Sequence, residues 1–185
     1  MSLDGGGAPA LSVVFFDFSA TLSSPQFIPR AGELALPDNY ELCMNMLADE
    51  IFENFGGVDR VMRLRLMLER MRARRVQFYI ISLGFKEVIR HHLCTVGLGE
   101  FFPPDRVFGQ DSPELSRVCH QKARLIERIL FDHGLSAKAA LFVDDSAEHI
   151  WLCRKLEVCA CLLVFGNGIS FQEMQMLEDR LGDSH

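Results

Sequence analysis

The sequence predicts an α/β fold in which a single parallel sheet is doubly wound, with helices on both of its faces. Two observations lead to this prediction. Four short apolar runs are nearly continuous rather than alternating, which is typical of strands buried on both faces of a parallel sheet. Segments with helical periodicity separate these runs, so strand and helix alternate along the chain.

The predicted strands are rich in Val, Ile and Phe, and they cover residues 11–16, 76–81, 139–143 and 159–165. A weaker fifth strand is expected at residues 106–108. We expect all four strong runs to be buried on both faces, because none of them alternates with polar residues.

The helical segments have recognisable ends. Pro37-Asp38 begins a helix that Gly56-Gly57 ends. Asp111-Ser112-Pro113 supplies a cap and a proline at the first helical position for a helix that runs to Gly134. The remaining helices are predicted at residues 58–74, 85–96, 146–156 and 170–181.

A chain of 185 residues corresponds to about one domain of roughly 150 residues. We expect residues 10–185 to form that domain and residues 1–9 to be a flexible tail. The tail has neither a basic region nor an apolar stretch, so it is not expected to be a signal peptide, and a cytoplasmic location is expected. No apolar run approaches the 18 residues or so that a membrane-spanning helix needs.

The charge balance excludes one class of function. Acidic residues outnumber Lys and Arg by 25 to 19, and the formal net charge is −6. A protein with this balance is not expected to bind nucleic acid or an anionic membrane through its overall charge.

Seven arginines between Arg60 and Arg75 lie on one predicted helix. They are expected either to form a solvated face opposite the apolar stripe or to dock an anionic partner. The six cysteines lie in apolar periodic segments and lack zinc-site spacing, so we expect buried, reduced thiols. His92 and His149 are expected to face solvent.

Polar residues follow three of the predicted strands. Asp17 comes directly after the first strand, Ser82 ends the second, and Asp144-Asp145 follows the third. Because the carboxyl ends of parallel strands meet at one edge of the sheet, we expect these side chains to lie together. Lys122, on the helix before the third strand, could add a cation.

These residue types predict phosphoryl chemistry. Two unit charges about 4 Å apart repel by about 4 kcal/mol at an effective dielectric constant of about 20, so three carboxylates stay ionised only around a cation. A site made of oxygen ligands suits Mg²⁺. With Lys122 and a hydroxyl group, such a site would cradle a phosphoryl group and leave one carboxylate to attack phosphorus. Each residue alone could be a cap, a turn or a surface residue, and only their combination favours a site.

The order Asp17…Ser82…Lys122…Asp144-Asp145 resembles the four motifs of the haloacid dehalogenase superfamily, and the resemblance covers residues 11–165. It implies that Asp17 is the nucleophile and forms an aspartyl intermediate. Lys122 would neutralise the phosphoryl group and orient that nucleophile.

The same resemblance implies the remaining roles. Ser82 and Leu83 would bind the transferred phosphoryl group. Asp144 would be a Mg²⁺ ligand, and Asp145 a second ligand or a residue that supports one. Ser19 would offer its backbone carbonyl to the metal, which any residue can do.

Ser19 departs from the superfamily's phosphatase pattern, Asp-x-Asp-x-Thr, because the sequence here is Asp17-Phe18-Ser19-Ala20-Thr21. The second Asp is the general acid/base in those phosphatases, and such a group typically contributes about 10²–10⁴-fold to the rate. Its absence predicts slow turnover of simple phosphate esters. Dehalogenases, phosphonatases and P-type ATPases of the superfamily also lack this Asp, so inactivity does not follow.

The interval between Asp17 and Ser82 holds 64 residues, one helix of which is needed as a crossover. Residues 23–57 are therefore expected to form at most a small cap over the site. An open site would admit a phosphorylated small molecule or a phosphoprotein. The alternative is a catalytically impaired pseudoenzyme that serves as a binding module. Dehalogenase chemistry is disfavoured by the short cap and the paired carboxylates Asp144 and Asp145.

Overall fold

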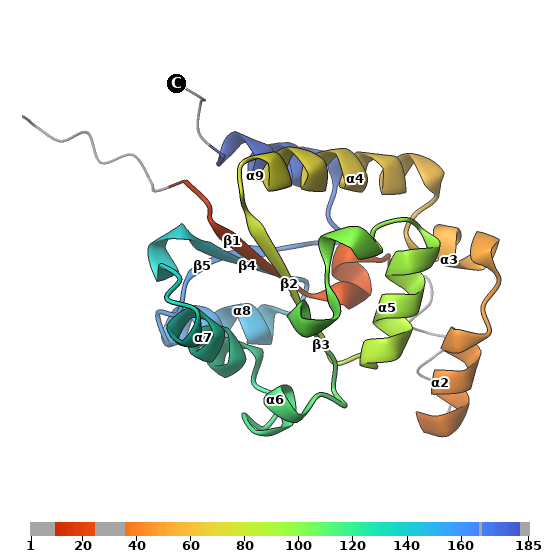
Figure 1. Ribbon diagram of the computed structural model, residues 1–185, viewed down its shortest axis with the longest axis horizontal. Helices are drawn as coiled ribbons and strands as arrows, with labels where there is room; N and C mark the ends of the chain where they lie inside the picture. Colours follow the sequence, from red (N-terminus) through yellow and green to blue (C-terminus); the bar gives the residue numbers. More distant parts are fainter. Residues whose placement is uncertain (1–9, 25–35, 167, 182–185) are drawn as a thin grey trace, which may run out of the picture.

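Five parallel strands form the central sheet, in the order β3-β2-β1-β4-β5 (Figure 1). The computed structural model describes residues 10–24, 36–166 and 168–181. The expected tail at residues 1–9 and residues 25–35 of the expected cap segment lie outside this part of the chain. The strands are β1 (Val13–Phe16), β2 (Gln77–Ile81), β3 (Val107–Phe108), β4 (Ala140–Asp144) and β5 (Ala160–Leu163). The predicted α/β class is confirmed.

Helices alternate with the strands along the chain. The α-helices are α2 (Leu36–Met44), α3 (Ala48–Asn54), α4 (Val58–Ala73), α5 (Lys86–Thr95), α6 (Pro113–Ser116), α7 (Lys122–Asp132), α8 (Ala147–Lys155) and α9 (Phe171–Asp179). The described residues also contain four short turns: η1 (Phe18–Leu22), η3 (Gly99–Phe101), η4 (Pro104–Arg106) and η5 (Ala137–Ala139). None of the helices in the described residues is long and apolar enough to cross a membrane.

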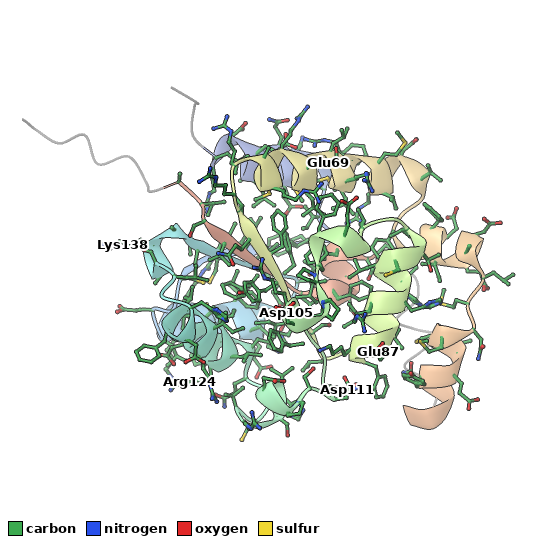
Figure 2. The ribbon with its side chains drawn as sticks, viewed as in Figure 1. Glu69, Glu87, Asp105, Asp111, Arg124 and Lys138 are labelled. Atoms are coloured by element: carbon green, nitrogen blue, oxygen red, sulfur yellow. The ribbon has the colours of Figure 1, made fainter. Side chains whose placement is uncertain are left out.

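The sheet separates two apolar cores, because successive residues of a strand point to opposite faces. Val14 and Phe16 of β1 pack on the face covered by α4 and α9, whereas Val13 and Phe15 pack on the face covered by α7 and α8. Side chains fill the space between the sheet and both helical layers (Figure 2). Glu69 on α4 and Arg124 on α7 lie on opposite outer sides of this sandwich.

The prediction that all four strong strands are buried on both faces is wrong for β5. Its first residue, Ala160, is exposed and the other three are only partly buried. β5 is an edge strand that pairs with β4 alone, so one of its sides has no neighbouring strand. The apolar sequence of β5 therefore predicted more burial than the strand has.

Two predicted helices are each divided in the structure. The helix expected at residues 37–56 is divided into α2 and α3 at an extended residue, Leu47, which is 71% exposed. The helix expected at residues 113–134 is divided into α6 and α7, because Cys119 (φ 53°) and His120 (φ 60°) adopt left-handed conformations. Neither break contains the Gly or Pro that usually marks one.

The arginines of α4 are mostly paired, so the helix is not a bare cationic face. Arg63 and Arg70 both form ion pairs with Glu178 of α9, and Arg65 and Arg72 both pair with Glu100. The prediction of solvent exposure is wrong for Arg60, which is buried.

All six cysteines are free thiols, but the expectation that all are buried is wrong for four of them. Cys94 and Cys119 are exposed, and Cys159 and Cys161 are only partly buried. Cys153, on α8, packs in the core, and its Sγ lies 3.8 Å from the Sγ of Cys159.

Candidate active site

The strand β1 delivers Asp17 to the carboxyl edge of the sheet. The backbone N–H of Asp17 donates to the carbonyl of Val143, which extends the pairing of β1 with β4 by one step. The chain then turns sharply, with Ser19 in an extended conformation and Ala20 in a left-handed one (φ 57°). This turn places both Asp17 and Ser19 against one pocket.

Hydrogen bonds from Arg60 to backbone carbonyl oxygens stabilise this turn. Its guanidinium donates to the carbonyl oxygens of Leu22 (2.7 Å), Phe55 (2.8 Å), Thr21 (3.1 Å) and Ile169 (3.2 Å). Burial lowers the pKa of Arg60 to about 10, which still leaves it charged at neutral pH. The sequence did contain a signal for this contact. Arg60 lies at helical spacing from the buried residues Leu64, Met67 and Met71.

Lys122 joins two of the three carboxylates. As the first residue of α7, it extends its Nζ to 2.6 Å from Oδ1 of Asp17 and 2.8 Å from Oδ2 of Asp144. All three side chains are buried. Burial acts to lower the pKa of Lys122, but the charges of the two carboxylates outweigh it and raise this pKa. Lys122 is therefore a fixed positive charge between the ends of β1 and β4.

Asp144 is held on both of its oxygens. Its Oδ1 accepts a hydrogen bond from the backbone N–H of Ser146 (2.7 Å), and its Oδ2 lies 3.3 Å from Nδ1 of His149 as well as near Lys122. The prediction that His149 faces solvent is therefore wrong. It sits in the first turn of α8, and a helix that begins at a strand end carries its first-turn side chains to the same edge.

Asp145 completes a cluster of carboxylates. One oxygen from each of Asp17, Asp144 and Asp145 lies within 4.8 Å of the others. Burial raises the pKa of Asp145, and the charges of Asp17 and Asp144 raise it further. Burial likewise raises the pKa of Asp17, although Lys122 opposes this. Three carboxylates against one ammonium leave two negative charges uncompensated, so this oxygen-only set fits a hard divalent cation.

The end of β2 brings Ser82 and Leu83 to the other side of the cluster. The backbone N–H of Ser82 donates to the carbonyl of Phe108, and its Oγ accepts from the backbone N–H of Gly84 at 3.3 Å. Ser82 is buried and Leu83 is 46% exposed, and both line the pocket.

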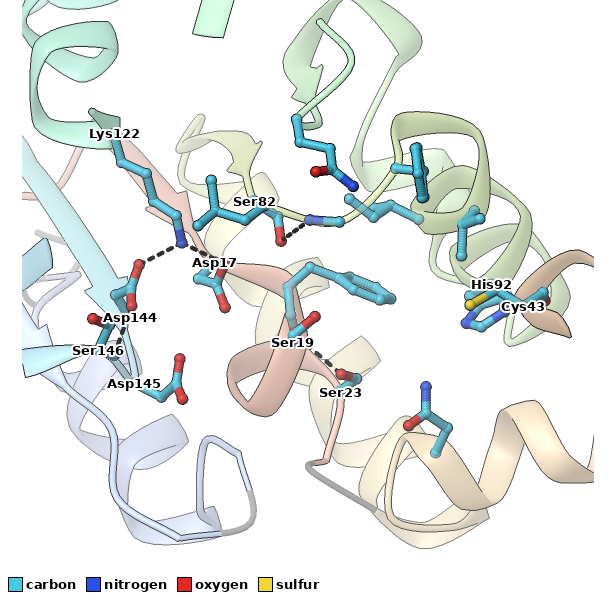
Figure 3. A pocket seen from close by; sticks show the side chains of 18 of the residues that line it. Asp17, Ser19, Ser23, Cys43, Ser82, His92, Lys122, Asp144, Asp145 and Ser146 are labelled. Carbon is cyan, nitrogen blue, oxygen red and sulfur yellow. Dashed lines mark hydrogen bonds and ion pairs between the residues drawn. The ribbon is translucent and has the colours of Figure 1, made fainter. Parts of the chain in front are cut away.

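One cavity of about 360 Å³ connects these groups (Figure 3). The structure brings every candidate residue to it: Asp17, Ser19, Ser82, Leu83, Lys122, Asp144 and Asp145. The cavity continues past Ser19 to Cys43 and His92. The prediction of a solvent-facing His92 is wrong, since it is 1% exposed and its Nε2 lies 2.8 Å from the carbonyl oxygen of Cys43.

Asn54 is another residue that sequence reasoning missed. It is the last residue of α3, it is 4% exposed, and it lines the far part of the cavity. Its Oδ1 is closed to solvent and has no hydrogen-bond partner among the described residues. A helix-terminal Asn is ordinarily a surface residue, so the sequence carried no signal for this placement.

Comparison with known proteins identifies the fold through structure alone. No protein-family model matches the chain, and neither does any curated protein sequence. Among solved structures, a haloacid dehalogenase-like hydrolase from Streptococcus pneumoniae has a TM-score of 0.53 at 17% identity, covering 90% of each chain.

Two further solved structures agree with the first. A subfamily IA hydrolase of this superfamily from Geobacter sulfurreducens has a TM-score of 0.55 at 14% identity, over 97% of this chain and 99% of the other. The cobalt-bound deoxy-D-mannose-octulosonate 8-phosphate phosphatase from Haemophilus influenzae has a TM-score of 0.52 at 11% identity, over 93% and 90%. The chain therefore has the fold of the haloacid dehalogenase superfamily.

Proposed function

We propose that the protein is a Mg²⁺-dependent phosphohydrolase or phosphotransferase that acts through an aspartyl-phosphate on Asp17. The observation that carries this proposal is the contact of Lys122 with both Asp17 and Asp144, with Asp145 close by. A buried carboxylate with one oxygen held by an ammonium group keeps its other oxygen for attack on phosphorus.

In the proposed reaction, a carboxylate oxygen of Asp17 forms a bond to phosphorus while the bond from phosphorus to the leaving group breaks. Water then attacks phosphorus, phosphate leaves, and the carboxylate of Asp17 is restored. Lys122 neutralises the charge of the phosphoryl oxygens, and Ser82 and the backbone of Leu83 bind them.

Asp17, Asp144 and Asp145, with the backbone carbonyl of Ser19, would hold the metal ion. Bound there, the ion would supply positive charge next to the phosphoryl group. The oxygen-only donor set favours Mg²⁺. The excess negative charge of the cluster predicts that Mg²⁺ raises the melting temperature of the wild-type protein, and that Asp145→Asn weakens this rise.

Ser19 determines which substrates turn over. A serine hydroxyl does not protonate a departing alkoxide near neutral pH, so esters should react slowly, whereas acyl phosphates carry leaving groups that need no proton. The substrate would be a phosphorylated small molecule or a phosphoprotein, approached past a small cap formed within residues 23–57. The free thiols agree with a reducing compartment such as the cytoplasm.

A comparison of wild type with Ser19→Asp tests this proposal, using a phosphate-ester panel and acetyl phosphate, with Mg²⁺ or with EDTA. We expect Mg²⁺-dependent turnover of acetyl phosphate by the wild type, and a gain of about 10²-fold on esters for Ser19→Asp. Asp17→Asn should abolish both activities. Turnover that survives Asp17→Asn or EDTA would contradict the proposal.

Ser19 also favours a second candidate, a pseudoenzyme that binds phosphorylated ligands without turning them over. It predicts Mg²⁺ and phosphate binding with no turnover even of acetyl phosphate, and no gain from Ser19→Asp.

An anionic partner at the helix between Arg60 and Arg75 is not part of either proposal. Such a partner would have to displace Glu100 and Glu178 from the arginines they already pair with.

A further inference from the structure

Three of the six cysteines lie together outside the candidate active site. Cys153 is in the last turn of α8, Cys159 comes just before β5, and Cys161 is on β5. All three side chains pack with the apolar core on the α7 and α8 side of the sheet, and none of them lines the cavity described above. Because α8 packs against β5 (Figure 1), the three thiols meet between this helix and the edge strand.

Cys153 and Cys159 are close enough to form a disulfide bond. Their Sγ atoms are 3.8 Å apart, and rotation of the two side chains can bring them to the bond length of about 2.05 Å. The backbone N–H of Val158 donates to the carbonyl oxygen of Cys153 (3.1 Å), so the chain just before Cys159 is already tied to the end of α8. The backbone therefore keeps this pair of thiols together.

The third thiol, Cys161, is the one that ionises. The neighbouring thiols of Cys153 and Cys159, together with the charge of Arg154, outweigh burial and hold the pKa of Cys161 well below its usual range. Cys159 acts to lower the pKa of Cys153, but Cys161 and burial outweigh it and raise this pKa to about 12. The contacts of Cys159 with the other two thiols, and its burial, raise the pKa of Cys159. At neutral pH the cluster therefore holds one thiolate beside two protonated thiols.

Solvent reaches the cluster from the edge of the sheet. Cys159 and Cys161 are both partly exposed, whereas Cys153 is fully buried. Among the strands that the structure describes, β5 pairs with β4 alone, so no strand covers its outer side. A small oxidant can therefore meet the thiolate of Cys161, while Cys153 is in contact with sulfur rather than with water.

We propose that Cys153, Cys159 and Cys161 form a site that hydrogen peroxide or another small hydroperoxide oxidises reversibly, with a disulfide between Cys153 and Cys159 as the product. The proposal does not rest on the proposed function, because its residues are separate from the cavity and its carboxylates. Disulfides that form in reducing compartments are usually transient and are often used to sense oxidants.

The oxidation has three steps. The thiolate of Cys161 attacks the peroxide, so that an S–O bond forms, the O–O bond breaks and hydroxide leaves. The sulfur of Cys153 then attacks the sulfur of Cys161. An S–S bond forms, the S–O bond breaks, and the hydroxyl group leaves as water with the proton of Cys153. Finally, Cys159 attacks the sulfur of Cys153 and displaces Cys161, and the proton of Cys159 neutralises the hydroxide from the first step.

The last step favours Cys159 because a thiol of low pKa is the better leaving group, and Cys161 has the lowest pKa of the three. In sum, two thiols and one hydrogen peroxide give one disulfide and two water molecules. Cys161 ends as the thiolate that it was at the start.

Peptide mapping tests the proposal, because trypsin separates the two sides of the site. It cuts after Arg154, so Cys153 leaves in the peptide 139–154, whereas the other two thiols leave in the peptide 156–180. The wild-type protein is treated with a small excess of hydrogen peroxide, free thiols are blocked with N-ethylmaleimide, and the digest is analysed by mass spectrometry. We expect the two peptides to be linked, with the maleimide on Cys161, and the link to be lost after treatment with dithiothreitol.

Three single variants separate the roles of the thiols. Cys161→Ser should slow formation of the link about tenfold, because only thiols of raised pKa remain to attack the peroxide. Cys159→Ser should stop the reaction after its second step and leave a link between Cys153 and Cys161. Cys153→Ser should give no link and leave a sulfenic acid on Cys161 that dimedone traps.

The double variant Cys94→Ser/Cys119→Ser is the matched control. Both of these thiols are exposed and lie outside the cluster, so their removal should leave the link and its rate of formation as in the wild type. Circular dichroism and the melting temperature of each variant verify that it is folded. If Cys153→Ser does not fold, Cys159→Ser still decides, since it changes only a partly exposed position.

Three results would overturn the proposal. One is a peptide 156–180 that is oxidised to a sulfinic acid without being linked to the peptide 139–154. Another is a disulfide within the peptide 156–180, between Cys159 and Cys161. The third is a Cys159→Ser protein that is folded but forms no link. A folded Cys161→Ser protein that forms the link at the wild-type rate would overturn the role of Cys161.

Discussion

Two buried cations, Lys122 and Arg60, hold the segment that follows β1, and they do so with opposite kinds of partner. Lys122 contacts two carboxylates, whereas Arg60 contacts only backbone carbonyl oxygens. Burial acts to lower the pKa of both groups. The pKa of Arg60 falls to about 10, whereas the charges of the neighbouring carboxylates raise the pKa of Lys122.

This difference in partners separates a contact that stabilises the fold, at Arg60, from one that we expect to take part in the reaction, at Lys122. The carbonyl oxygens around Arg60 carry no net charge, and all of its nitrogen atoms donate to them, so the contact is complete. Around Lys122 the carboxylates exceed the cation, so the cluster still attracts positive charge. We therefore expect changes at Lys122 to act mainly on activity and changes at Arg60 to act mainly on stability.

Lys122→Met provides the largest expected effect. It keeps most of the length of the side chain and removes its charge, so the phosphoryl oxygens lose their neutralising partner. We expect the kcat for acetyl phosphate to fall by about 10²- to 10³-fold. Lys138→Met, at an exposed lysine, is the control and should leave kcat unchanged. A folded Lys122→Met protein with wild-type kcat would remove Lys122 from the reaction.

Arg60→Met should cost about 3 kcal/mol or more in the free energy of unfolding. It leaves several buried carbonyl oxygens unpaired, and each unpaired group costs about 1–3 kcal/mol. Urea unfolding measures this loss. Arg128→Met is the control, because Arg128 is exposed and forms only a surface ion pair, so a change below about 0.5 kcal/mol is expected. The comparison breaks down if Arg60→Met lowers kcat as much as Lys122→Met without lowering stability.

Gly168→Ala tests the contact of Arg60 with the backbone by placing a Cβ next to its guanidinium group. A Cβ at Gly168 (φ 84°) would lie 2.5 Å from Nη2 of Arg60 and 2.6 Å from the carbonyl oxygen of Ser23. We expect a loss of about 2–3 kcal/mol in the free energy of unfolding, from overpacking and the left-handed conformation together. Gly166→Ala controls for the conformation alone. Gly166 has a similar φ of 87° and nothing within 4 Å of its Cβ position, so it should lose about 1 kcal/mol.

Glu178→Gln gives the smallest effect, because Gln keeps the shape of the side chain and its carbonyl oxygen still accepts from Arg63 and from the exposed Arg70. Burial acts to raise the pKa of Glu178, but its hydrogen bonds with Arg63 and Arg70 and their charges outweigh burial and lower it. The resulting stability is present above the unfolded-state pKa and is lost as the pH falls through the lower folded-state pKa.

Unfolding of wild type and Glu178→Gln should therefore differ by about 1 kcal/mol or less at pH 7. The difference should shrink as the pH falls below the unfolded-state pKa of about 4.3, and it should vanish once the pH is below the lower folded-state pKa, where the carboxyl group of Glu178 is protonated in both states. A difference that stays constant down to pH 2 would show that packing, not charge, links α9 to α4.

Much of this architecture could be predicted because it depends on local patterns. Continuous apolar runs located the strands, and the residues directly after them located Asp17, Ser82 and Asp144 at a common edge. Contacts between distant segments could not be predicted in the same way. Arg60 binds carbonyl oxygens 38 and 109 residues away, and backbone carbonyls leave no trace in the side-chain sequence.

The sequence did not predict the two helix breaks for a related reason. Leu47, Cys119 and His120 interrupt helical segments without Gly or Pro, so local propensity favoured continuous helices. Packing overrode that propensity. The interruption after α6 is the one that matters for the site, because it lets α7 begin at Lys122 beside Asp17.

The left-handed turn before Lys122 also has a consequence for the shelf life of the protein. Cys119 combines an unfavourable backbone conformation, at a cost of about 1–2 kcal/mol, with an exposed thiol. An exposed thiol on a strained turn is open to air oxidation and to disulfide-linked dimers during storage. Asn tolerates left-handed backbone better than Cys. Cys119→Asn should therefore melt no lower than the wild type and show less disulfide-linked dimer on a non-reducing gel without added reductant, and any dimer that remains should be lost when the other exposed thiol, Cys94, is also replaced by Ser.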